Sequence, residues 1–599
     1  RLSFRLQVGA QVVMAIFYNQ LYFKDKLMVN GDVTVLGTWN QGRQQVMGTK
    51  LLVNQPGKET LGAIYAANKH VRQATLRQLI HQAFSQYQNV IATLLPTSLR
   101  QRYQLLDRVT MFRWLHFPEN GDQAKAARRT AAYEEVFLFQ LRLQSMRLAR
   151  RRAAGPAIEY NNEELRAFIK TIPFELTGAQ KRVVNEICRD LRAPFQMNRL
   201  LQGDVGSGKT VVAAIAIYAT ILTGHQAALM APTEILAEQH AEKLAKLFEN
   251  TPVNVALLTG SLTAKQHRLL SEQIASGKCN LIIGTHALIQ GPIEFANLGL
   301  AIIDEQHRFG VDQRKALREK GDNPNVLAMT ATPIPRTLSI TAYGEMDVSI
   351  IDELPAGRQP IKTTWLKESQ GEAALDFLRQ QLAAGAQAYV VSPLIEESEK
   401  LDVQNATALY EHFAATFGPT YQVGLLHGRM SAEEKAAAMA AFSANQVQVL
   451  VATTVIEVGV DNPNASVMVI YDADRFGLAQ LHQLRGRVGR GQRQSYCLLV
   501  ADPKTPEGKQ RMETMVETTD GFVVAQRDLE LRGAGDLLGK KQSGMPDFKI
   551  ADPVGDLKMM QYARQDALTL LESSHWDEQD DHLPLVAYLK RRNLQTHFD

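Results

Sequence analysis

Short apolar runs alternate with amphipathic segments between about Gly178 and Ala501. Strands buried on both faces of a parallel sheet read as near-continuous apolar runs, and parallel strands require helical crossovers between them. The pattern therefore predicts α/β domains built on parallel sheets. The predicted strands are Ala227–Ala231, Leu281–Gly284, Leu300–Asp304, Val326–Met329, Ala388–Ser392, Val423–His427, Val449–Ala452, Val467–Tyr471 and Tyr496–Val500.

A stretch that contains Pro and Gly, Ile351–Ile361, follows the strand Val326–Met329 and precedes the strand Ala388–Ser392. Such composition is typical of a linker. We therefore expect two halves that share one fold, near Gln180–Ser349 and Gln359–Val500.

The parts of the chain on either side of these halves follow other patterns. Residues 1–56 contain short strand-like stretches with turn signals at Asn30-Gly31 and Gly37, which fits a small β-barrel of OB type. Residues 57–160 contain the segments Thr75–Asn89 and Ala126–Arg152, both of which we expect to be helical. The chain after about residue 510 is helical and polar, and we expect its acidic stretch Asp577–Asp581 to be solvated surface.

Composition limits the class of protein. A chain of 599 residues is too long for one hydrophobic core, so about three to five domains are expected. The formal net charge of +4 is too small to indicate nucleic-acid binding without local basic patches. The three cysteines are far apart and fit neither a disulfide framework nor a zinc site, which favours a reducing cytoplasm.

No signal peptide or membrane span is recognisable. The longest apolar stretch, near Val211–Leu222, is too short to cross a bilayer. The chain starts at Arg1, inside a strand-like pattern and without Met, and we expect an N-terminal portion of the natural protein to be missing.

A glycine-rich motif opens the first half. Gly203–Thr210, GDVGSGKT, matches G-x-x-x-x-G-K-[ST], a loop whose backbone N–H groups surround the phosphates of ATP. Lys209 would contact the β- and γ-phosphates, and Thr210 would bind Mg²⁺. A glycine-rich turn without a ligand is the alternative. The candidate nucleotide-binding residues are Gln180, as a reader of adenine, with Gly203, Gly206, Gly208, Lys209 and Thr210.

An acidic pair follows an apolar strand of the same half. Asp304 and Glu305 come after LGLAII, the arrangement in which one carboxylate holds Mg²⁺ and the next orients or deprotonates the attacking water. Acidic residues that only solvate the end of a strand are the alternative. The glycine-rich loop, about a hundred residues upstream on the same pattern, argues against it.

Two arginines of the second half complete the candidate ATP site. Arg487 and Arg490, in LRGRVGRG, would act as arginine fingers that reach the γ-phosphate only when the halves close. A basic phosphate-binding loop is the alternative. The residues expected to couple the site to the interface between the halves are Gln306, His307, Thr330 and Thr332. We expect the two threonines to form hydrogen bonds with Asp304 and with that interface.

Several candidates for DNA contact follow predicted strands, where hydroxyls and backbone N–H groups can meet a phosphate backbone without reading bases. They are Thr233, Thr285, Arg429 and Thr453, and each would be an ordinary turn residue if it stood alone. The expected barrel adds two adjacent aromatics, Phe17 and Tyr18. Successive side chains of a strand point to opposite faces, so only one of the two can lie in the core, and the other could stack on an unpaired base.

Taken in order, these motifs closely resemble those of the RecG-type ATP-dependent DNA helicases of bacteria, over nearly the whole chain. The resemblance rests on QGDVGSGKT, MAPTEILAEQH, IIDEQHRFGV, MTATPIPRT, VATTVIEVGVD, LAQLHQLRGRVGRG and RDLELRGAGDLLG. DEQHRFGV and Arg527–Gly539 are the most specific of these segments. The resemblance implies a superfamily 2 double-stranded DNA translocase that uses ATP and Mg²⁺ and acts on stalled replication forks and Holliday junctions in recombination and repair.

The resemblance also implies a role for each region. The wedge aromatics of the family fall on Phe17 and Tyr18, and its translocation motif falls on Arg527–Gly544, including Arg527, Arg532 and Gln542. The family usually carries more chain before the wedge. The expected domains are 1–56, an OB-type wedge truncated at its start; 57–160, a helical linker; 161–350 and 351–510, two RecA-like α/β domains; and 511–599, a helical C-terminal region with the translocation motif.

We expect a monomer of the bacterial cytoplasm, associated with the nucleoid, that binds branched double-stranded DNA and has single-stranded-DNA-binding protein as a candidate partner. One alternative, a transcription-repair coupling translocase, would need large extra modules on both sides of the motor. Another, a non-catalytic DNA-binding scaffold, would have a degenerate nucleotide site. An RNA helicase of the DEAD class would carry Asp-Glu-Ala-Asp where this chain has Asp304-Glu305-Gln306-His307.

Overall fold

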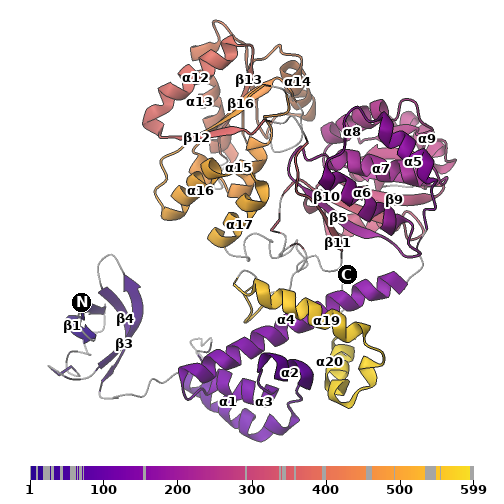
Figure 1. Cartoon of the computed structure of the whole chain (residues 1–599). Helices are drawn as coiled ribbons and strands as arrows, with labels where there is room; N and C mark the ends of the chain where they lie inside the picture. The colour runs from indigo at the N-terminus through magenta and orange to yellow at the C-terminus, as the bar shows by residue number, and fades with distance from the viewer. Residues whose placement is uncertain are drawn as a thin grey trace. The chain divides into compact units, whose positions relative to one another are not determined.

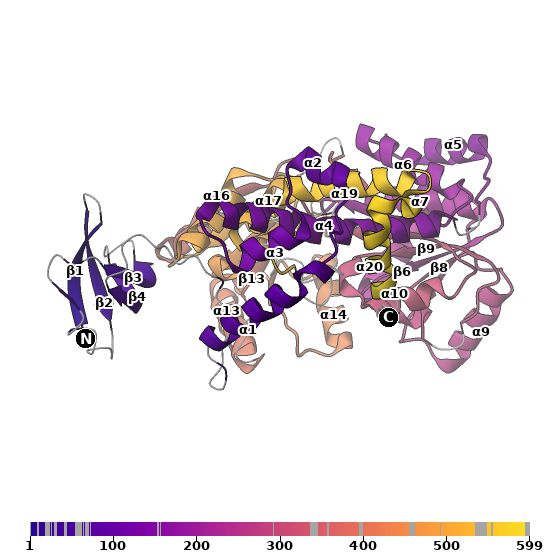
Figure 2. The same cartoon turned by 90° about the horizontal axis from the view of Figure 1, so that it is seen from below.

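The chain divides into two compact units, Arg1–Ala131 together with Asp577–Asp599, and Ala132–Trp576. Figures 1 and 2 show its elements from two directions. The computed structural model describes residues 2–8, 11–17, 24, 27–28, 31, 33–40, 45–53, 63, 65, 71, 73–152, 155, 157–290, 293–332, 334–335, 339, 346–355, 359–393, 399–453, 462–491, 493–532, 548–552 and 555–593.

The N-terminal strands form a four-stranded sheet of order β1-β2-β4-β3 among the described residues. The strands are β1 (Leu2–Val8), β2 (Gln11–Phe17), β3 (Val33–Asn40) and β4 (Gln45–Val53). β2 pairs with β4 in parallel, whereas the other two pairs are antiparallel. The core of the sheet includes Ala15, Phe17 and Leu51. Short strands in residues 1–56 were predicted and are confirmed, and the closure of the sheet into an OB-type barrel stays a prediction.

The helices of the first unit include one element from the far end of the chain. Its helices are α1 (Gln73–Tyr87), α2 (Thr97–Tyr103), α3 (Arg108–His116), the start of α4 (Gly121–Arg152) and α20 (Leu583–Asn593). Asp581 accepts hydrogen bonds from the backbone N and the Oγ1 of Thr97 at 2.6 and 2.7 Å, and the guanidinium of Arg108 lies over the ring of Tyr588. All residues of the acidic stretch Asp577–Asp581 are exposed, as expected, and Asp581 in addition binds the first turn of α2.

A parallel sheet of seven described strands organises the first half of the α/β region, which we call the first lobe. Its order is β11-β5-β10-β9-β6-β8-β7. The strands are β5 (Asn198–Gly203), β6 (Gln226–Met230), β7 (Val255–Leu258), β8 (Leu281–Gly284), β9 (Leu298–Ile303), β10 (Asn325–Thr330) and β11 (Asp347–Ile351). The helices are α5 (Asn162–Thr171), α6 (Gly178–Leu191), α7 (Lys209–Ile221), α8 (Glu234–Leu247), α9 (Ala264–Ala275) and α10 (Val311–Arg318). Every residue of α7 from Val211 to Ile221 is buried, which fixes its N-terminus firmly to the core.

The second lobe has a parallel sheet of its own, with six described strands in the order β12-β17-β16-β13-β15-β14. The strands are β12 (Lys362–Leu366), β13 (Gln387–Val391), β14 (Val423–Leu426), β15 (Val449–Ala452), β16 (Ala465–Tyr471) and β17 (Tyr496–Val500). The helices are α12 (Gly371–Ala383), α13 (Glu399–Phe417), α14 (Ala432–Ser443) and α15 (Leu478–Arg485). The chain contains two parallel α/β sheets, a small N-terminal sheet and helical regions, which confirms the predicted fold class.

The two lobes share one local turn. After β9, Glu305 has a φ of 47°, a 3-10 helix η5 (Gln306–Arg308) follows, and α10 begins behind Gly310. After β16, Asp472 has a φ of 46°, the 3-10 helix η8 (Ala473–Arg475) follows, and α15 begins behind Gly477.

The capping of the helix that follows is also the same in both lobes. The backbone N of Gly310 donates to the Gln313 side chain at 3.0 Å, and that of Gly477 donates to the Gln480 side chain at 3.2 Å. A residue other than glycine in the left-handed region costs on the order of 1 kcal/mol or more and is found mainly at functional sites. Both lobes therefore use a strained residue to turn a buried strand sharply into a capped helix.

Helices after the second lobe complete the second unit. They are α16 (Pro506–Glu517), α17 (Gly521–Arg532) and α19 (Leu557–Glu572). α19 lies against the second part of α4, where the Tyr133 hydroxyl donates to Asp566 at 2.7 Å (Figure 1). Within the part of the chain that the structure describes, no helix has the length and apolar character needed to cross a membrane.

Candidate ATP site and DNA-contacting residues

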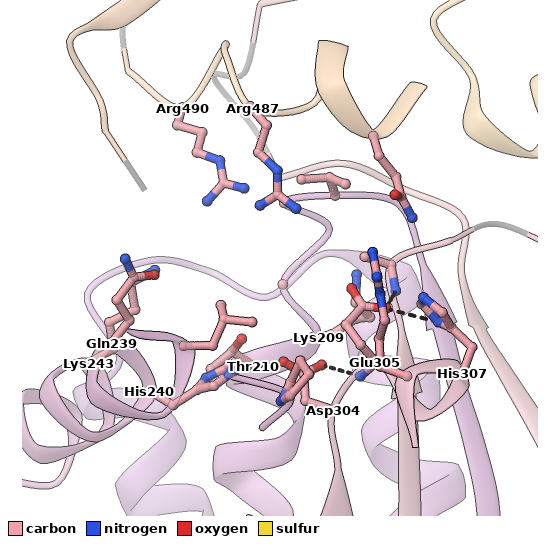
Figure 3. Close-up of a pocket in the computed structure, with 18 residues that line it drawn as sticks. Lys209, Thr210, Gln239, His240, Lys243, Asp304, Glu305, His307, Arg487 and Arg490 are labelled. Atoms are coloured by element: carbon pink, nitrogen blue, oxygen red, sulfur yellow. Dashed lines mark hydrogen bonds and ion pairs between the residues drawn. The ribbon is translucent and has the colours of Figure 1, made fainter. Parts of the chain in front are cut away.

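A cavity of about 270 Å³ is lined by residues of both lobes. The first lobe contributes the loop after β5, the end of β9 and one side of α8, and the second lobe contributes Gln483, Arg487 and Arg490. In Figure 3 Arg487 and Arg490 point into this cavity from the second lobe, toward the side that carries Lys209 and Glu305. The structure thus brings residues of three separate motifs to one site.

The glycine-rich loop connects β5 to the N-terminus of α7. Gly206 and Gly208 have φ values of 77° and 88°, which favour glycine because a Cβ is rarely tolerated there. Lys209 Nζ donates to the carbonyls of Gly203 and Asp204 at 2.7 and 2.9 Å. Burial lowers the pKa of Lys209, against the pull of nearby carboxylates. The loop therefore presents a cation and a helix N-terminus to the cavity, an arrangement suited to phosphate.

Gln180, on α6, contacts this loop outside the cavity. Its side chain accepts from the backbone N of Thr177 at 2.9 Å and donates to the Ser207 carbonyl at 2.8 Å. The side chain is almost completely buried and does not line the cavity. In this structure the amide oxygen of Gln180 is bonded to Thr177 and its amide nitrogen to the loop, so the adenine-reading role stays a prediction that requires these bonds to change.

Asp304 ends β9 deep in the cavity. Its Oδ2 accepts from His240 Nε2 on α8 at 2.8 Å, a partner that the sequence analysis did not identify. Burial raises the pKa of Asp304, but the bond from His240 and the charge of Lys209 outweigh it and hold the pKa below its usual value. The carboxylate is therefore kept ionised, as a ligand for a cation requires.

Glu305 is held by the strand end that follows it in the sheet. Its Oε2 accepts from the backbone N of Ala331 at 3.2 Å and lies 3.5 Å from the hydroxyl of Thr330. The predicted partner of Thr330 was Asp304, so the structure corrects this detail. Burial and the neighbouring Asp304 raise the pKa of Glu305. A carboxylate with a raised pKa that faces a cavity is a candidate general base.

The two residues after Glu305 differ in exposure. Gln306 is buried, whereas His307 is partly exposed, with Nδ1 3.5 Å from Glu305 Oε2. Withdrawal of His307 from bulk solvent, together with the charge of Arg308, lowers its pKa to about 4. His307 is therefore neutral at physiological pH, and its coupling role stays a prediction.

The helix α15 touches the first lobe at two points. Gln483 Nε2 donates to Thr332 Oγ1 at 2.7 Å. His482 Nε2 donates to Asp204 Oδ1 at 2.6 Å, and Arg485 donates to His482 Nδ1 at 2.9 Å, which fixes the tautomer of the imidazole. Thr332 was predicted at this interface, but Gln483 and His482 were not singled out, although both lie in the quoted segment LAQLHQLRGRVGRG.

The threonines expected to contact DNA differ in their surroundings. Thr233 caps α8 through a bond from the backbone N of Leu236. Thr285 and Thr453 are buried, and their Oγ1 atoms have no hydrogen-bond partner within the described residues. A buried hydroxyl without a partner is costly, so these two positions are suited to a ligand that supplies one.

The arginines expected to contact DNA are only partly described. Arg429 is exposed, and Arg527 is exposed on α17, where it pairs with Glu530 at 3.4 Å. Arg532 is the last residue of α17, but its side chain lies outside the described part of the chain, as does the whole of Gln542. The DNA-contact roles of all these residues stay predictions.

Phe17 does not fit the role of a base-stacking residue. It is fully buried, its ring stacks on Phe4 with centroids 6.0 Å apart, and a Cβ on Gly48 would collide with it. Its position in the alternating pattern of β2, with Val13 and Ala15, is the physical reason, because this face forms the core. Tyr18, the other member of the aromatic pair, lies outside the described residues, so its role stays a prediction.

The fit of a Mg²⁺ ion depends on two oxygen ligands. Thr210 and Asp304 both line the cavity, and no group of three or more His, Cys, Asp or Glu side chains suited to a metal occurs among the described residues. Mg²⁺ usually keeps several waters and takes one or two protein ligands beside the phosphates of a nucleotide. An ionised Asp304 beside a hydroxyl therefore fits this ion.

Two parallel α/β lobes that both line a candidate ATP site are the arrangement expected of a helicase. The family models described as "DEAD/DEAH box helicase", "Helicase conserved C-terminal domain" and "ATP-dependent DNA helicase RecG, domain 3, C-terminal" match residues 177–340, 372–492 and 518–595. Two relatives named ATP-dependent DNA helicase RecG are similar along most of their length. That of Bacillus subtilis (strain 168) is 53% identical over 96% of this chain and 85% of its own, and that of Streptococcus pneumoniae serotype 4 is 49% identical over 99% and 88%.

A solved structure gives the same result in three dimensions. "Structure of RecG bound to three-way DNA junction" matches with a TM-score of 0.68 and 38% identity, over 93% of this chain and 75% of that one. The chain belongs to the RecG family of ATP-dependent DNA helicases. The resemblance and the enzyme class predicted from the motifs are confirmed.

Proposed function

We propose that this protein is an ATP-driven double-stranded DNA translocase that remodels branched DNA, regressing stalled forks and migrating Holliday junctions in recombination and repair. The observation that carries the proposal is the cavity lined by both lobes, in which a nucleotide can pull the lobes together. The similar structure bound to a three-way DNA junction supports a branched substrate.

In the proposed reaction, Lys209 and the N–H groups at the start of α7 bind the β- and γ-phosphates of ATP. Lys209 exchanges its bonds to the loop carbonyls for bonds to phosphate oxygens. Thr210 and Asp304 would hold Mg²⁺, which neutralises charge on the phosphates when bound. Glu305, held by Ala331, orients the attacking water and accepts its proton.

Arg487 and Arg490 reach the developing charge on the γ-phosphate from the second lobe. Because they belong to the other lobe, hydrolysis depends on closure, and loss of the γ-phosphate favours opening. The bond between Gln483 and Thr332 links the same lobe to the strand end that holds Glu305. Repeated closure and opening would move the lobes along the phosphate backbone, with contacts through Thr233, Thr285, Arg429, Thr453, Arg527, Arg532 and Gln542.

We also propose the remaining features of the protein's working state. One copy of the chain carries a complete set of candidate catalytic residues in the lining of the cavity, which supports action as a monomer: Lys209, Asp304, Glu305, Arg487 and Arg490. The proposed location is the bacterial cytoplasm, at the nucleoid, with single-stranded-DNA-binding protein as a partner. The mass in solution with and without DNA tests the first point, and a pull-down with that protein tests the last.

The deciding experiment measures ATP hydrolysis and strand separation together on matched linear duplex, single strand, fork and four-way junction. We expect strong stimulation by the branched DNAs, with separation into component arms. Hydrolysis driven equally by plain duplex, without strand separation, would favour the alternative of a translocase that displaces bound proteins.

A further inference from the structure

A histidine on α8 binds the carboxylate that ends β9. His240 Nε2 donates to Asp304 Oδ2 at 2.8 Å, and the backbone N of Glu305 donates to Asp304 Oδ1 at 3.0 Å. Because an ionised carboxylate only accepts hydrogen bonds, the proton of the first bond belongs to Nε2. Each carboxylate oxygen therefore has a donor from the protein, which fixes the orientation of the group and leaves further lone pairs for a cation.

The position of His240 is set by a helix that is held on its buried face and at its start. Ala237 and Leu244, three residues before His240 and four after it, are buried on the same face of α8. Glu234, the first residue of α8, accepts through Oε1 from the backbone N of Gly260 at 2.8 Å. The imidazole therefore reaches Asp304 from a packed element of the first lobe.

The strand before α8 holds the backbone of the same aspartate. The backbone N of Asp304 donates to the carbonyl of Met230, the last residue of β6, at 2.9 Å. Because α8 begins at Glu234, only a short connection separates this strand end from the helix. The segment Met230–His240 therefore fixes both the backbone and the side chain of Asp304.

The bond from His240 also bears on Lys209. Lys209 and Asp304 line the same cavity (Figure 3), where opposite charges attract strongly because little water screens them. Lys209 Nζ instead donates to the carbonyls of Gly203 and Asp204. An ion pair between Lys209 and Asp304 would occupy the cation that a phosphate needs and the carboxylate that Mg²⁺ needs. A donor already placed on Asp304 Oδ2 reduces the gain from such a pair.

We infer that His240 is a positioning residue that orients Asp304 toward Mg²⁺ and keeps it from pairing with Lys209. The inference rests on the proposed function, to which the ion and the role of Asp304 belong, and adds to it a residue outside the four motifs of the ATP site. His240 acts through Asp304 and requires no contact with the nucleotide. A histidine that only satisfied the core would stabilise the lobe and leave the affinity for the ion unchanged.

The test uses two variants that lose the bond and one that keeps it. His240→Leu removes the donor, and the side chain in His240→Asn is too short to reach Oδ2. In His240→Gln the amide nitrogen lies at about the reach of the imidazole Nε2. His267→Leu is the matched control, because His267 is on α9 of the same lobe and does not line the cavity.

The first readout is the binding of a fluorescent ADP analogue with Mg²⁺ and with a chelator, in the absence of DNA. The ratio of the two dissociation constants reports how much Mg²⁺ strengthens binding of the nucleotide. We expect this ratio to fall about tenfold to hundredfold in His240→Leu and His240→Asn, the usual effect of losing a residue that orients a metal ligand. His240→Gln should recover most of the ratio, and His267→Leu should match the wild type.

The second readout separates positioning from general stability. In ATP hydrolysis with fork DNA, the Mg²⁺ concentration for half-maximal rate should rise about tenfold in His240→Leu, whereas a loss of folded protein would lower only the maximal rate. An unchanged ADP ratio in the loss variants, or an equal fall in His267→Leu, would overturn the inference. Failure of both loss variants to fold would also overturn it, because His240 would then serve the fold.

The outcome for the proposed function is read separately. Absence of stimulation by branched DNA in the wild type would refute that function. The ADP ratio is measured without DNA, so it would still decide whether His240 positions Asp304.

Discussion

Arg490 shows what a single residue contributes to a site shared by two lobes. Its side chain lines the cavity from the second lobe, whereas the loop that binds phosphate belongs to the first. In the proposed mechanism, a nucleotide binds to the first lobe without Arg490, and Arg490 is needed to stabilise charge in the transition state.

Arg490→Ala should therefore bind ATP about as well as the wild type and hydrolyse it about a thousandfold more slowly, the lower range for an arginine finger. Nucleotide binding by fluorescence and turnover with fork DNA measure the two properties separately. Arg493→Ala is the control, because Arg493 is exposed and donates to the Ala384 carbonyl. Parallel loss of binding and turnover in Arg490→Ala would contradict the assignment.

The cysteines differ in reactivity for a reason that lies in their burial. Cys188 and Cys497 are buried and Cys279 is partly exposed. Burial raises the pKa of the Cys497 thiol to about 12, so at pH 8 only about one molecule in ten thousand carries the reactive thiolate there.

Iodoacetamide at pH 8 should therefore label Cys279 first in the folded protein and all three positions after unfolding. Peptide mass spectrometry identifies the labelled residue. Cys279→Ser should leave the folded protein almost unlabelled. Early labelling of Cys497 would show that the core of the second lobe opens more readily than its burial implies.

At the scale of elements, α15 is a helix of the second lobe that forms hydrogen bonds to the first lobe. It carries His482 and Gln483, which bond Asp204 in the phosphate-binding loop and Thr332 after β10. The turn that starts α15 is strained and capped, so the orientation of this helix is set by the strand before it. We therefore expect the position of α15 as a whole, and not one contact alone, to determine how the lobes close.

Gln483→Ala should slow DNA-stimulated hydrolysis about fivefold, because a neutral hydrogen bond that favours the closed state contributes about 1 kcal/mol. Steady-state turnover at saturating ATP and duplex measures the effect. Gln380→Ala, at an exposed position of α12, is a control for a glutamine lost from the same lobe. Unchanged turnover in Gln483→Ala would remove this contact from the coupling path.

The strands that the sequence pattern did not predict have broken apolar runs. β7, β11 and β12 lie at sheet edges, where one face stays accessible and the apolar run is broken, as in Lys362–Leu366. β5 is an inner strand, but two buried polar residues, Arg199 and Gln202, interrupt its apolar run. Arg199 pairs with Asp190, and Gln202 donates to the Ile334 carbonyl. Three inner strands with continuous apolar runs, β8, β15 and β17, were predicted to the residue.

Some residues of the candidate site could be predicted from the sequence, and others could not. Motif spacing predicted candidates on a single loop or strand end, and two of them, Lys209 and Asp304, line the same cavity. His240 and His482 were not predicted because their bonds span 64 and 278 positions, to Asp304 and Asp204, and no local pattern marks them. Phe17 was assigned to DNA contact through the resemblance, and the burial of its face of β2 argues against that role.

At the scale of the whole molecule, the two ends of the chain belong to one compact unit. Asp577–Asp599 belongs to the same compact unit as the N-terminal residues, although the sequence analysis placed all of 511–599 in one C-terminal region. One contact that joins them is the bond of Asp581 to Thr97. Burial raises the pKa of Asp581, but the bonds from Thr97 outweigh it and lower the pKa below its usual value.

Asp581→Ala should destabilise the first turn of α2 by about 1 kcal/mol, a usual loss for a helix-terminal carboxylate. Faster amide exchange in Thr97–Tyr103, measured at pH 7, reports the change. Because the folded-state pKa is depressed, the stabilisation is present above the ordinary aspartate value near pH 4 and is lost as pH falls below it. Asp580→Ala is the neighbouring control, and an equal effect there would argue against a specific contact.

The shared turn after β9 and β16 also bears on the history of the chain. The segments IIDEQHRFGVDQ and VIYDADRFGLAQ place a strained acidic residue, a 3-10 turn, Arg-Phe-Gly and a capping glutamine in the same order. Such detailed agreement is the trace expected of gene duplication. One copy of the turn places Glu305 at the cavity, and the other starts α15, which bonds to Thr332 of the first lobe. The split site would then be an ancient dimer interface that two copies of one ancestor formed before they were joined into a single chain.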